Sequence, residues 1–244
     1  MLRIGIPSNG ALYKTTLKFL ASCGLEVTRP NDRNYTGEIP SLPGSIVHFQ
    51  RATDITWKVE DDSVDAGIVG YDRFLENRRG EDTLAVFPRL GFGGCSLVLA
   101  VPELWVDVSS VADLAEISVD FRASGKDLRI ATKFPKLVEQ FLLDRGVNYF
   151  SLVPTSGALE VAPAMGSADM IADITETGTT LRENRLKIVH GGIVIRSQAC
   201  LIVNTDSVRR DPARLAAVRS MIDSIENNLR SEGLYQDAPA MERL

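Results

Sequence analysis

The sequence predicts an α/β protein of two lobes, in which strands and helices alternate along the chain. Three short apolar runs in its first part have the length of strands, and residues that favour helices separate them. Strands are expected at 3–7, 46–49 and 66–69, and helices at 15–23 and 55–61, the second capped by Thr53 or Asp54. Strands joined through helices pair in parallel, so side chains that follow their carboxyl ends should gather at one edge of the sheet.

A glycine-rich segment predicts the crossing into the second lobe. Gly91, Gly93 and Gly94 precede a strong strand at 97–101, after which the alternation resumes. Further strands are expected at 129–132 and 149–153, and helices at 111–114, 135–144 and 158–165. We expect Ser156 to cap the last of these helices and Glu160 to lie in its first turn, where a carboxylate suits the helix dipole.

Two apolar runs, at 193–195 and 200–203, should return the chain to the first lobe, where Asp211-Pro212 begins a final helix. We therefore expect residues 1–93 with 195–244 to form one lobe and residues 94–194 to form the other. Two α/β lobes joined by two crossings resemble the type II periplasmic-binding-protein architecture, in which a cleft between the lobes holds the ligand. The active site is expected in that cleft.

The composition and net charge of the sequence argue against several classes of function. The 27 basic residues are outnumbered by 32 acidic ones, and this net charge of −5 argues against nucleic-acid binding. Only two histidines occur, which excludes a histidine-rich metal site, and the three distant cysteines do not suggest a disulfide framework. No apolar run is long enough to span a membrane, and residues 1–7 lack the apolar core of a signal peptide, so a cytoplasmic protein is expected.

The segment from Met170 to Leu181 predicts a binding site for a sugar phosphate. Met170–Ala172 is a short apolar run that ends in the carboxylate of Asp173, and helix-favouring residues begin at Leu181. Between them lie Thr175, Glu176, Thr177, Gly178, Thr179 and Thr180. Free N–H groups at a helix start attract phosphate, while a carboxylate accepts hydrogen bonds from sugar hydroxyls. Taken alone, the same residues also fit a threonine-rich helix cap without a ligand.

The wider spacing resembles the signature of the ATP phosphoribosyltransferase family. The signature positions are filled by Glu160, Gly166, Ala168, Ile171, Asp173 and Thr177-Gly178-Thr179-Thr180-Leu181. Shorter matching pieces occur at 65–70, 92–95, 129–133, 157–163 and 196–200, so the resemblance covers essentially Leu2 to Leu229.

The resemblance implies transfer of the phosphoribosyl group of 5-phosphoribosyl 1-pyrophosphate to N1 of ATP, the first step of histidine biosynthesis. It assigns the 5′-phosphate to Thr177–Thr180, in a binding loop that also includes Thr175 and Glu176. It assigns the ribose hydroxyls to Asp173 with Glu160 in support, and the pyrophosphate, carried with Mg²⁺, to Arg33 and Arg51. Asp72 and Lys133 are expected on the ATP side, although Arg51 and Asp72 also fit a surface ion pair. Two other functions stay open: a two-lobed ligand-binding protein without chemistry, and a phosphoribosyltransferase for another base.

One loop departs from the family. Asn9-Gly10-Ala11-Leu12 stands where the family usually has Lys-Gly-Arg-Leu, so Gly10 is kept and two positive charges are missing. The chain is expected to form a homo-oligomer, a dimer or higher. The family has two forms. The long form carries a C-terminal histidine-sensing domain, and the short form pairs with a subunit similar to histidyl-tRNA synthetase. The sequence is expected to be a short form, with a truncated long form as the alternative.

Overall fold

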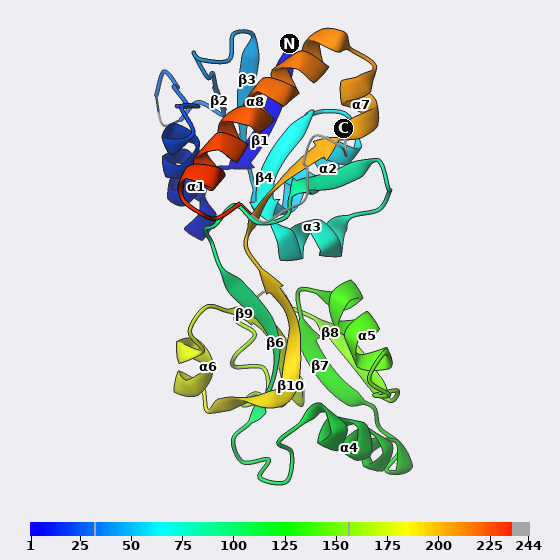
Figure 1. Cartoon of the computed structure of the whole chain (residues 1–244). Helices are drawn as coiled ribbons and strands as arrows, with labels where there is room; N and C mark the ends of the chain where they lie inside the picture. Colours follow the sequence, from blue (N-terminus) through cyan, green and yellow to red (C-terminus); the bar gives the residue numbers. More distant parts are fainter. Residues whose placement is uncertain (32, 156, 236–244) are drawn as a thin grey trace. The chain divides into compact units, whose positions relative to one another are not determined.

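The computed structural model describes residues 1–31, 33–155 and 157–235, and it divides into two compact α/β units (Figure 1). The first unit comprises Met1–Gly94 and the segment from Ser197 onward, and the second comprises Cys95–Arg196. Each unit contains one mixed sheet with its own apolar core. Among the described residues, no helix has the length and apolar character needed to cross a membrane.

The first unit is built on a six-stranded sheet. In sheet order its strands are β2 (Thr36–Gly37), β3 (Ser45–Gln50), β1 (Leu2–Pro7), β4 (Ala66–Gly70), β11 (Ala199–Asn204) and β5 (Thr83–Phe87). Strand β1 pairs in parallel with both β3 and β4, whereas β11 is antiparallel to β4 and β5. The loops that follow β1, β3 and β4 therefore leave the sheet at the same edge, as the alternating sequence predicted.

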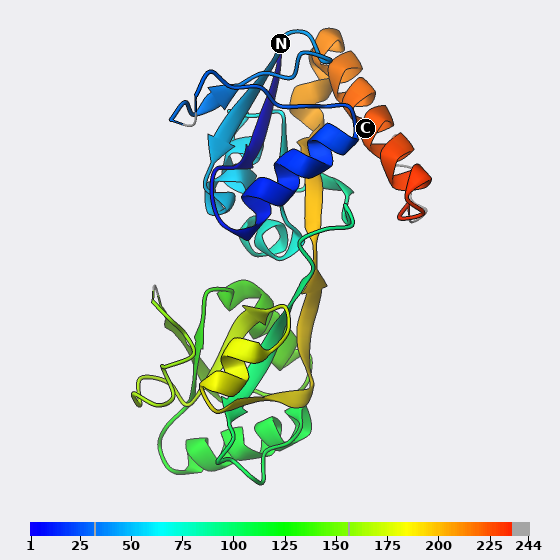
Figure 2. The ribbon, with the colours of Figure 1, turned by 90° about the vertical axis from the view of Figure 1, so that its left-hand side faces the viewer.

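Two pairs of helices cover the two faces of this sheet (Figures 1 and 2). One face packs against α1 and α8, and its core includes Ile68 and Leu201; the other packs against α2 and α3 through Val69 and Ile202. Successive residues of a strand thus pack against helices on opposite faces of the sheet. Each fully buried apolar side chain stabilises the folded state by about 1.5–3 kcal/mol. The helices of this unit are α1 (Ala11–Ser22), α2 (Ala52–Glu60), α3 (Tyr71–Asn77), α7 (Thr205–Arg209) and α8 (Pro212–Ser231).

The starts of these helices partly follow the sequence prediction. Asp211 caps α8 as expected, because its Oδ1 accepts hydrogen bonds from the N–H groups of Ala213 at 2.9 Å and Arg214 at 3.4 Å. The caps expected for α2 were wrong, since the helix begins at Ala52 after Arg51 and no side chain caps it. Helix α1 begins four residues earlier than expected because Gly10, at φ 78°, turns the chain directly after β1.

The second unit contains a five-stranded sheet with helices α4 and α5 on one face and α6 on the other (Figure 2). Strand β7 pairs in parallel with β8 and β9, whereas β6 is antiparallel to β9. In sheet order the strands are β10 (Leu186–Ser197), β6 (Cys95–Pro102), β9 (Met170–Thr175), β7 (Leu128–Thr132) and β8 (Phe150–Pro154). The helices are α4 (Val111–Ala123), α5 (Pro135–Leu143) and α6 (Thr179–Glu183).

The prediction of a helix at 158–165 is wrong. This segment forms successive turns, in which Ala162 N–H donates to Leu159 O and Met165 N–H donates to Val161 O, both at 3.0 Å. Pro163 lacks the N–H that would continue a helix by bonding the carbonyl four residues back, so the turns do not join into one. The expected cap, Ser156, lies outside the described residues.

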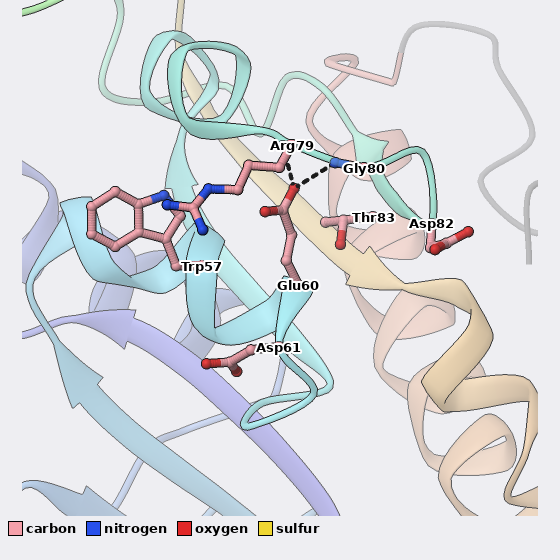
Figure 3. A pocket seen from close by; sticks show the side chains of 7 residues that line it. All are labelled: Trp57, Glu60, Asp61, Arg79, Gly80, Asp82 and Thr83. Atoms are coloured by element: carbon pink, nitrogen blue, oxygen red, sulfur yellow. Dashed lines mark hydrogen bonds between the residues drawn. The ribbon is translucent and has the colours of Figure 1, made fainter.

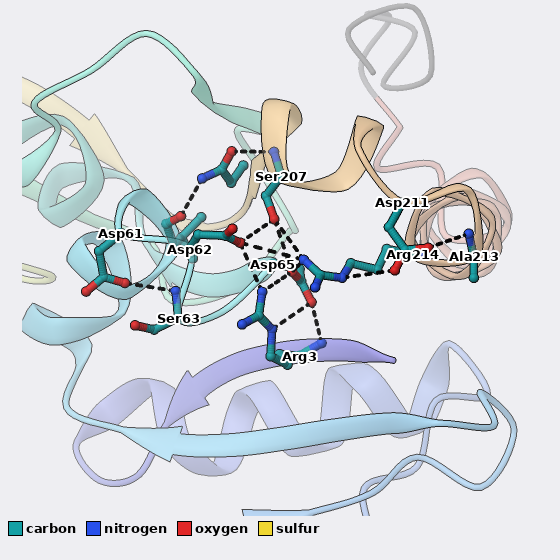
Figure 4. Close-up of polar contacts among 11 residues, drawn as sticks. Arg3, Asp61, Asp62, Ser63, Asp65, Ser207, Asp211, Ala213 and Arg214 are labelled. Atoms are coloured by element: carbon teal, nitrogen blue, oxygen red, sulfur yellow. Dashed lines mark hydrogen bonds and ion pairs between the residues drawn. The ribbon is translucent and has the colours of Figure 1, made fainter.

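A network of ion pairs and hydrogen bonds connects β1 with the last helices of the first unit (Figure 4). The Asp65 carboxylate is fully buried, and its Oδ1 lies 2.7 Å from Arg3 Nη2 and 3.1 Å from Arg214 Nη1. The neighbouring Asp62 accepts a hydrogen bond from the Ser207 hydroxyl and pairs with Arg3 at 3.0 Å. The network therefore joins β1, the turn before β4, α7 and α8.

We expect the free energy of unfolding to decrease at acidic pH, because Asp62 becomes protonated. The Ser207 hydroxyl, and then the Arg3 guanidinium, hold the pKa of Asp62 below its ordinary value of 3.8. A carboxylate with a lowered folded-state pKa stabilises the protein above the unfolded pKa, and this contribution is lost as the pH falls through the folded-state pKa. Urea unfolding should therefore show Asp62→Asn less stable than the parent at neutral pH, with the difference closing below pH 3.8.

Asp223→Asn, on the exposed side of α8, is the control and should leave the pH dependence unchanged. A stability difference between Asp62→Asn and the parent that stays constant from neutral pH to below 3.8 would show that the Asp62 charge does not stabilise the fold.

Candidate active site

The loop between β9 and α6 has the strand–turn–helix order that the sequence predicted. Gly178 turns the chain at φ 73°, and its N–H donates to Thr175 Oγ1 at 2.8 Å. The hydroxyls of Thr177 and Thr179 lie 2.9 Å apart, while Thr180 is exposed at the first turn of α6. The loop thus presents hydroxyls and the N-terminal end of a short helix to solvent, which are groups that bind phosphate.

Asp173 lies within β9 and not beyond its end, because the strand continues to Thr175. The side chain is half-buried, and its Oδ1 accepts a hydrogen bond from the N–H of Ile174 at 2.8 Å. Lys133 follows β7, whose last residue, Thr132, pairs with Ala172 of β9. The register therefore places Lys133 and Asp173 side by side at the carboxyl ends of neighbouring parallel strands.

Glu160 is half-buried in the turns that replace the expected helix. Its neighbour Leu159 belongs to the same buried apolar cluster as Leu181 of α6. The two ends of the signature, far apart in the sequence, thus pack against the same face of the sheet. Among the residues that the structure describes, no hydrogen bond holds the Glu160 carboxylate.

Sequence reasoning missed Arg182, the fourth residue of α6. Its Nη1 donates to the carbonyl of Thr177, and its Nη2 donates to Thr179 Oγ1, both at 3.2 Å. Helical side chains lean toward the N-terminus of their helix, so this arginine reaches back over the loop. The sequence signal for this contact is an arginine four residues after Gly178, because its side chain leans back toward the loop from the first turn of the helix.

Four segments of the first unit meet at the carboxyl edge of its parallel strands. Asn9 and Gly10 follow β1, Arg51 follows β3, and Asp72 follows β4, the three central neighbours in the sheet. The loop that carries Arg33 reaches the same edge, because Tyr35 O accepts a hydrogen bond from Phe49 N–H at 2.9 Å.

The surface ion pair considered for Arg51 and Asp72 is absent from the described residues. Asp72 is only 3% exposed, and its Oδ1 accepts a hydrogen bond from the Ser197 hydroxyl at 2.5 Å, while its N–H donates back to Ser197 Oγ at 2.9 Å. The side chains of Arg33 and Arg51 are exposed. At this edge, Asp72 fixes the turn after β4, and Arg33 and Arg51 expose positive charge to solvent.

The helices α1 and α2 also begin at this edge, and neither has a side-chain cap. Gly67 allows α2 to approach the sheet, because a Cβ there would lie 2.5 Å from Ile55 Cγ2 and 3.3 Å from Val59 Cγ2. Uncapped helix starts carry partial positive charge and free N–H groups, which are features that favour anions.

A cavity of about 390 Å³ lies at the other end of α2, away from this edge (Figure 3). The Arg79 guanidinium lies 5.3 Å from the ring centroid of Trp57, and Glu60 Oε1 accepts a hydrogen bond from Arg79 N–H at 2.8 Å and a longer one from Gly80 N–H at 3.4 Å. These contacts anchor the loop between α3 and β5, so we interpret this cavity as structural.

Comparisons with known proteins agree on one family. The family model described as ATP phosphoribosyltransferase matches residues 51–229. An ATP phosphoribosyltransferase from Brucella anthropi is 42% identical over 225 residues, which cover 90% of this chain and 96% of that protein. The ATP phosphoribosyl transferase (HisG:HisZ) complex from Thermotoga maritima contains a chain that matches with a TM-score of 0.71 at 25% identity, covering 95% of this chain and all of that one.

The fold also matches periplasmic binding proteins. A putative sulfonate-binding protein from Methylobacillus flagellatus matches with a TM-score of 0.58 at 16% identity, covering 99% of this chain and 71% of that one. At this identity the similarity concerns the fold alone, and it confirms the predicted architecture. From the family model and the close relatives, we conclude that the chain belongs to the ATP phosphoribosyltransferase family, whose reaction is the first step of histidine biosynthesis.

Proposed function

We propose that the loop between β9 and α6 binds the phosphoribosyl donor, and that the chain transfers this group from 5-phosphoribosyl 1-pyrophosphate to N1 of ATP. The observation that carries the proposal is the hydroxyl-rich turn between β9 and α6, which lies in the C-terminal part of the family signature. Thr175 Oγ1 takes the N–H of Gly178, and Thr177 Oγ1 takes the N–H of Thr179 at 3.4 Å. The phosphate is therefore left to the hydroxyls of Thr177, Thr179 and Thr180 and to the N–H groups of Thr177 and Thr180. Glu176 is exposed beside this set and carries the wrong charge for phosphate.

The reaction joins the adenine N1 lone pair to C1′ of ribose, while the C1′–oxygen bond breaks and pyrophosphate leaves with its electron pair. Positive charge develops on the ribose in the transition state, where a fixed carboxylate stabilises it. Asp173 is proposed to accept hydrogen bonds from the ribose hydroxyls and to supply this charge, and Glu160 is proposed to support the ribose. No covalent intermediate with the protein is needed, so positioning accounts for most of the catalysis.

The edge of the first unit is proposed to bind the anions of pyrophosphate and ATP. Arg33 and Arg51 contribute charge, while Asn9, Gly10 and the starts of α1 and α2 contribute hydrogen-bond donors. Lys133 remains our candidate contact for ATP. Asp72, which is buried against Ser197, is instead proposed to position the turn after β4.

Mg²⁺ fits this site as a companion of the pyrophosphate. Among the described residues, no group of three or more His, Cys, Asp or Glu side chains could hold a metal ion. Mg²⁺ is commonly held by substrate phosphates with one or two carboxylates, so the pyrophosphate itself would supply most of its ligands and of the charge that balances it. When bound, it would neutralise charge on the leaving pyrophosphate.

An assay with 5-phosphoribosyl 1-pyrophosphate that carries ³²P in its 5′-phosphate separates the three functions considered. With Mg²⁺ present, we expect label to transfer to ATP and not to other purine or pyrimidine bases, with stoichiometric release of pyrophosphate. Transfer to another base would assign a different phosphoribosyltransferase, and tight binding without turnover would assign a ligand-binding protein.

We further propose a second subunit as partner, because the solved relative from Thermotoga maritima is described as a HisG:HisZ complex. Sedimentation of the chain with a subunit of the HisZ kind should show a heavier species than either protein alone. Separate sedimentation of both at micromolar concentrations would contradict the assembly. A homo-oligomer and a cytoplasmic location remain predictions, the first from the resemblance and the second from the apolar pattern of the sequence.

Restoring the family's charges near Asn9 should strengthen donor binding. A charged hydrogen bond contributes about 1.5–3 kcal/mol, against about 1 for a neutral one, so Asn9→Lys with Ala11→Arg should lower the Kd for 5-phosphoribosyl 1-pyrophosphate about tenfold. The variant should also depend less on Mg²⁺. Isothermal titration with and without Mg²⁺ measures both effects.

The matched control places the same two charges at the exposed far end of α1, as Ala21→Arg with Ser22→Lys. This control should bind the donor as the parent does. Equal affinities for the parent and the Asn9→Lys, Ala11→Arg variant would show that the loop after β1 does not face the pyrophosphate.

A further inference from the structure

We propose that Arg182 is a phosphate-binding residue, which supplies the donor loop's own positive charge and makes the loop selective for a dianionic 5′-phosphate. The proposal rests on the donor site proposed above and extends it to a residue outside the Glu160–Leu181 signature.

The Arg182 guanidinium is fixed across the turn that should hold the phosphate. One of its nitrogens donates to the carbonyl of Thr177 and the other to the hydroxyl of Thr179, so it spans Gly178. A Cβ at Gly178 would lie only 3.1 Å from Arg182 Nη1. A glycine at this position thus serves two purposes, since it takes φ 73° and leaves room for the guanidinium against the backbone.

Three of the five guanidinium N–H donors remain for a ligand. Only the two bonds to Thr177 and Thr179 engage Arg182 among the residues that the structure describes, and the side chain is exposed. These two bonds orient the group before any ligand arrives, which lowers the entropy cost of binding. A planar guanidinium with free donors is the preferred partner of a phosphate.

Charge explains why the loop needs this arginine. The segment from Met170 to Asn184 contains three carboxylates, Asp173, Glu176 and Glu183, and Arg182 is its one basic residue. A phosphate monoester carries a charge of about −1.5 to −2 at pH 7, so this segment would repel it without a nearby cation. Charge-assisted hydrogen bonds from Arg182 offset that repulsion and grow with the charge of the phosphate.

The test is isothermal titration of ribose 5-phosphate into the full chain at pH 7.5 and pH 5. Arg182→Gln should raise the Kd at pH 7.5 about tenfold, because a charge-assisted bond to the dianion is lost. The variant should also lose most of the parent's preference for pH 7.5, since the monoester is mainly monoanionic at pH 5. Arg182→Lys should recover part of both effects. A purely structural role would change the Kd equally at both pH values.

Two further variants separate failure of this inference from failure of the donor site. Arg185→Gln removes an exposed positive charge three residues further on and should leave the Kd unchanged. Thr177→Val should weaken ribose 5-phosphate binding if the loop is the donor site. If Thr177→Val weakens binding while Arg182→Gln leaves the Kd and its pH dependence unchanged, the role of Arg182 is wrong. If neither variant alters binding, the donor site itself is wrong.

Discussion

Asp173→Asn and Thr177→Val should each lower kcat/KM about 10- to 1000-fold, which corresponds to about 1.4–4 kcal/mol of lost transition-state stabilisation. The first variant keeps the shape of the side chain but removes the charge that faces the developing positive ribose. The second removes a hydroxyl that also contacts Thr179, and so weakens both the phosphate contact and the order of the turn. Initial rates at varied donor concentration measure both effects.

These losses should occur in folded protein. Asp173 is only half-buried and accepts a hydrogen bond from the N–H of Ile174, which an asparagine oxygen can also accept, so circular dichroism and the melting temperature should change little. Asp107→Asn, at an exposed position of the same unit, should keep the parent's kinetics. Wild-type kinetics from a folded Asp173→Asn variant would rule out the proposed role of this carboxylate.

Asp65→Ala should lower the free energy of unfolding by about 3–5 kcal/mol, because it leaves the Arg3 and Arg214 guanidinium groups without their buried partner. Asp65 is completely buried, and its carboxylate also accepts the backbone N–H of Arg3 at 2.7 Å. The substitution therefore breaks contacts among β1, the turn before β4 and α8 at once. Urea unfolding at neutral pH measures the loss.

The matched control is Asp127→Ala, which removes a carboxylate that pairs with Arg122 at 3.2 Å on the surface. The side chains of Arg122 and Asp127 are both exposed. Exposed ion pairs stabilise a protein by only about 0–1 kcal/mol. Similar losses for the two variants would show that burial of Asp65 adds nothing, and that the network is not what joins the first unit's ends.

The fold could be predicted because its information is local. Apolar runs of strand length alternate with helix-favouring segments, and the glycine at 178 marks a turn whose φ of 73° suits that residue. The error at 158–165 is also local in origin, since Pro163 forbids the helix that its neighbours favour. Propensity therefore identified most of the strands, although not β2 and β5, and it misjudged one segment of the site.

The burial of Asp72 could not be predicted, because its partner Ser197 is 125 residues away in the sequence. The same limit applies to Asp65, whose partner Arg214 is 149 residues away. Arg182 is different, since its partners lie within five residues and follow from the lean of helical side chains. The family signature ends at Leu181, one residue before Arg182, and the resemblance assigned Arg33 and Arg51 to the pyrophosphate and no cation to the 5′-phosphate.

The most direct test of the donor site is a crystal structure of the chain with ribose 5-phosphate. We expect the phosphate oxygens to lie within hydrogen-bond distance of Thr177, Thr179 and Thr180 and beside Arg182, with the ribose hydroxyls toward Asp173. A phosphate bound instead at the edge near Asn9 and Arg51, with the loop between β9 and α6 vacant, would contradict the account.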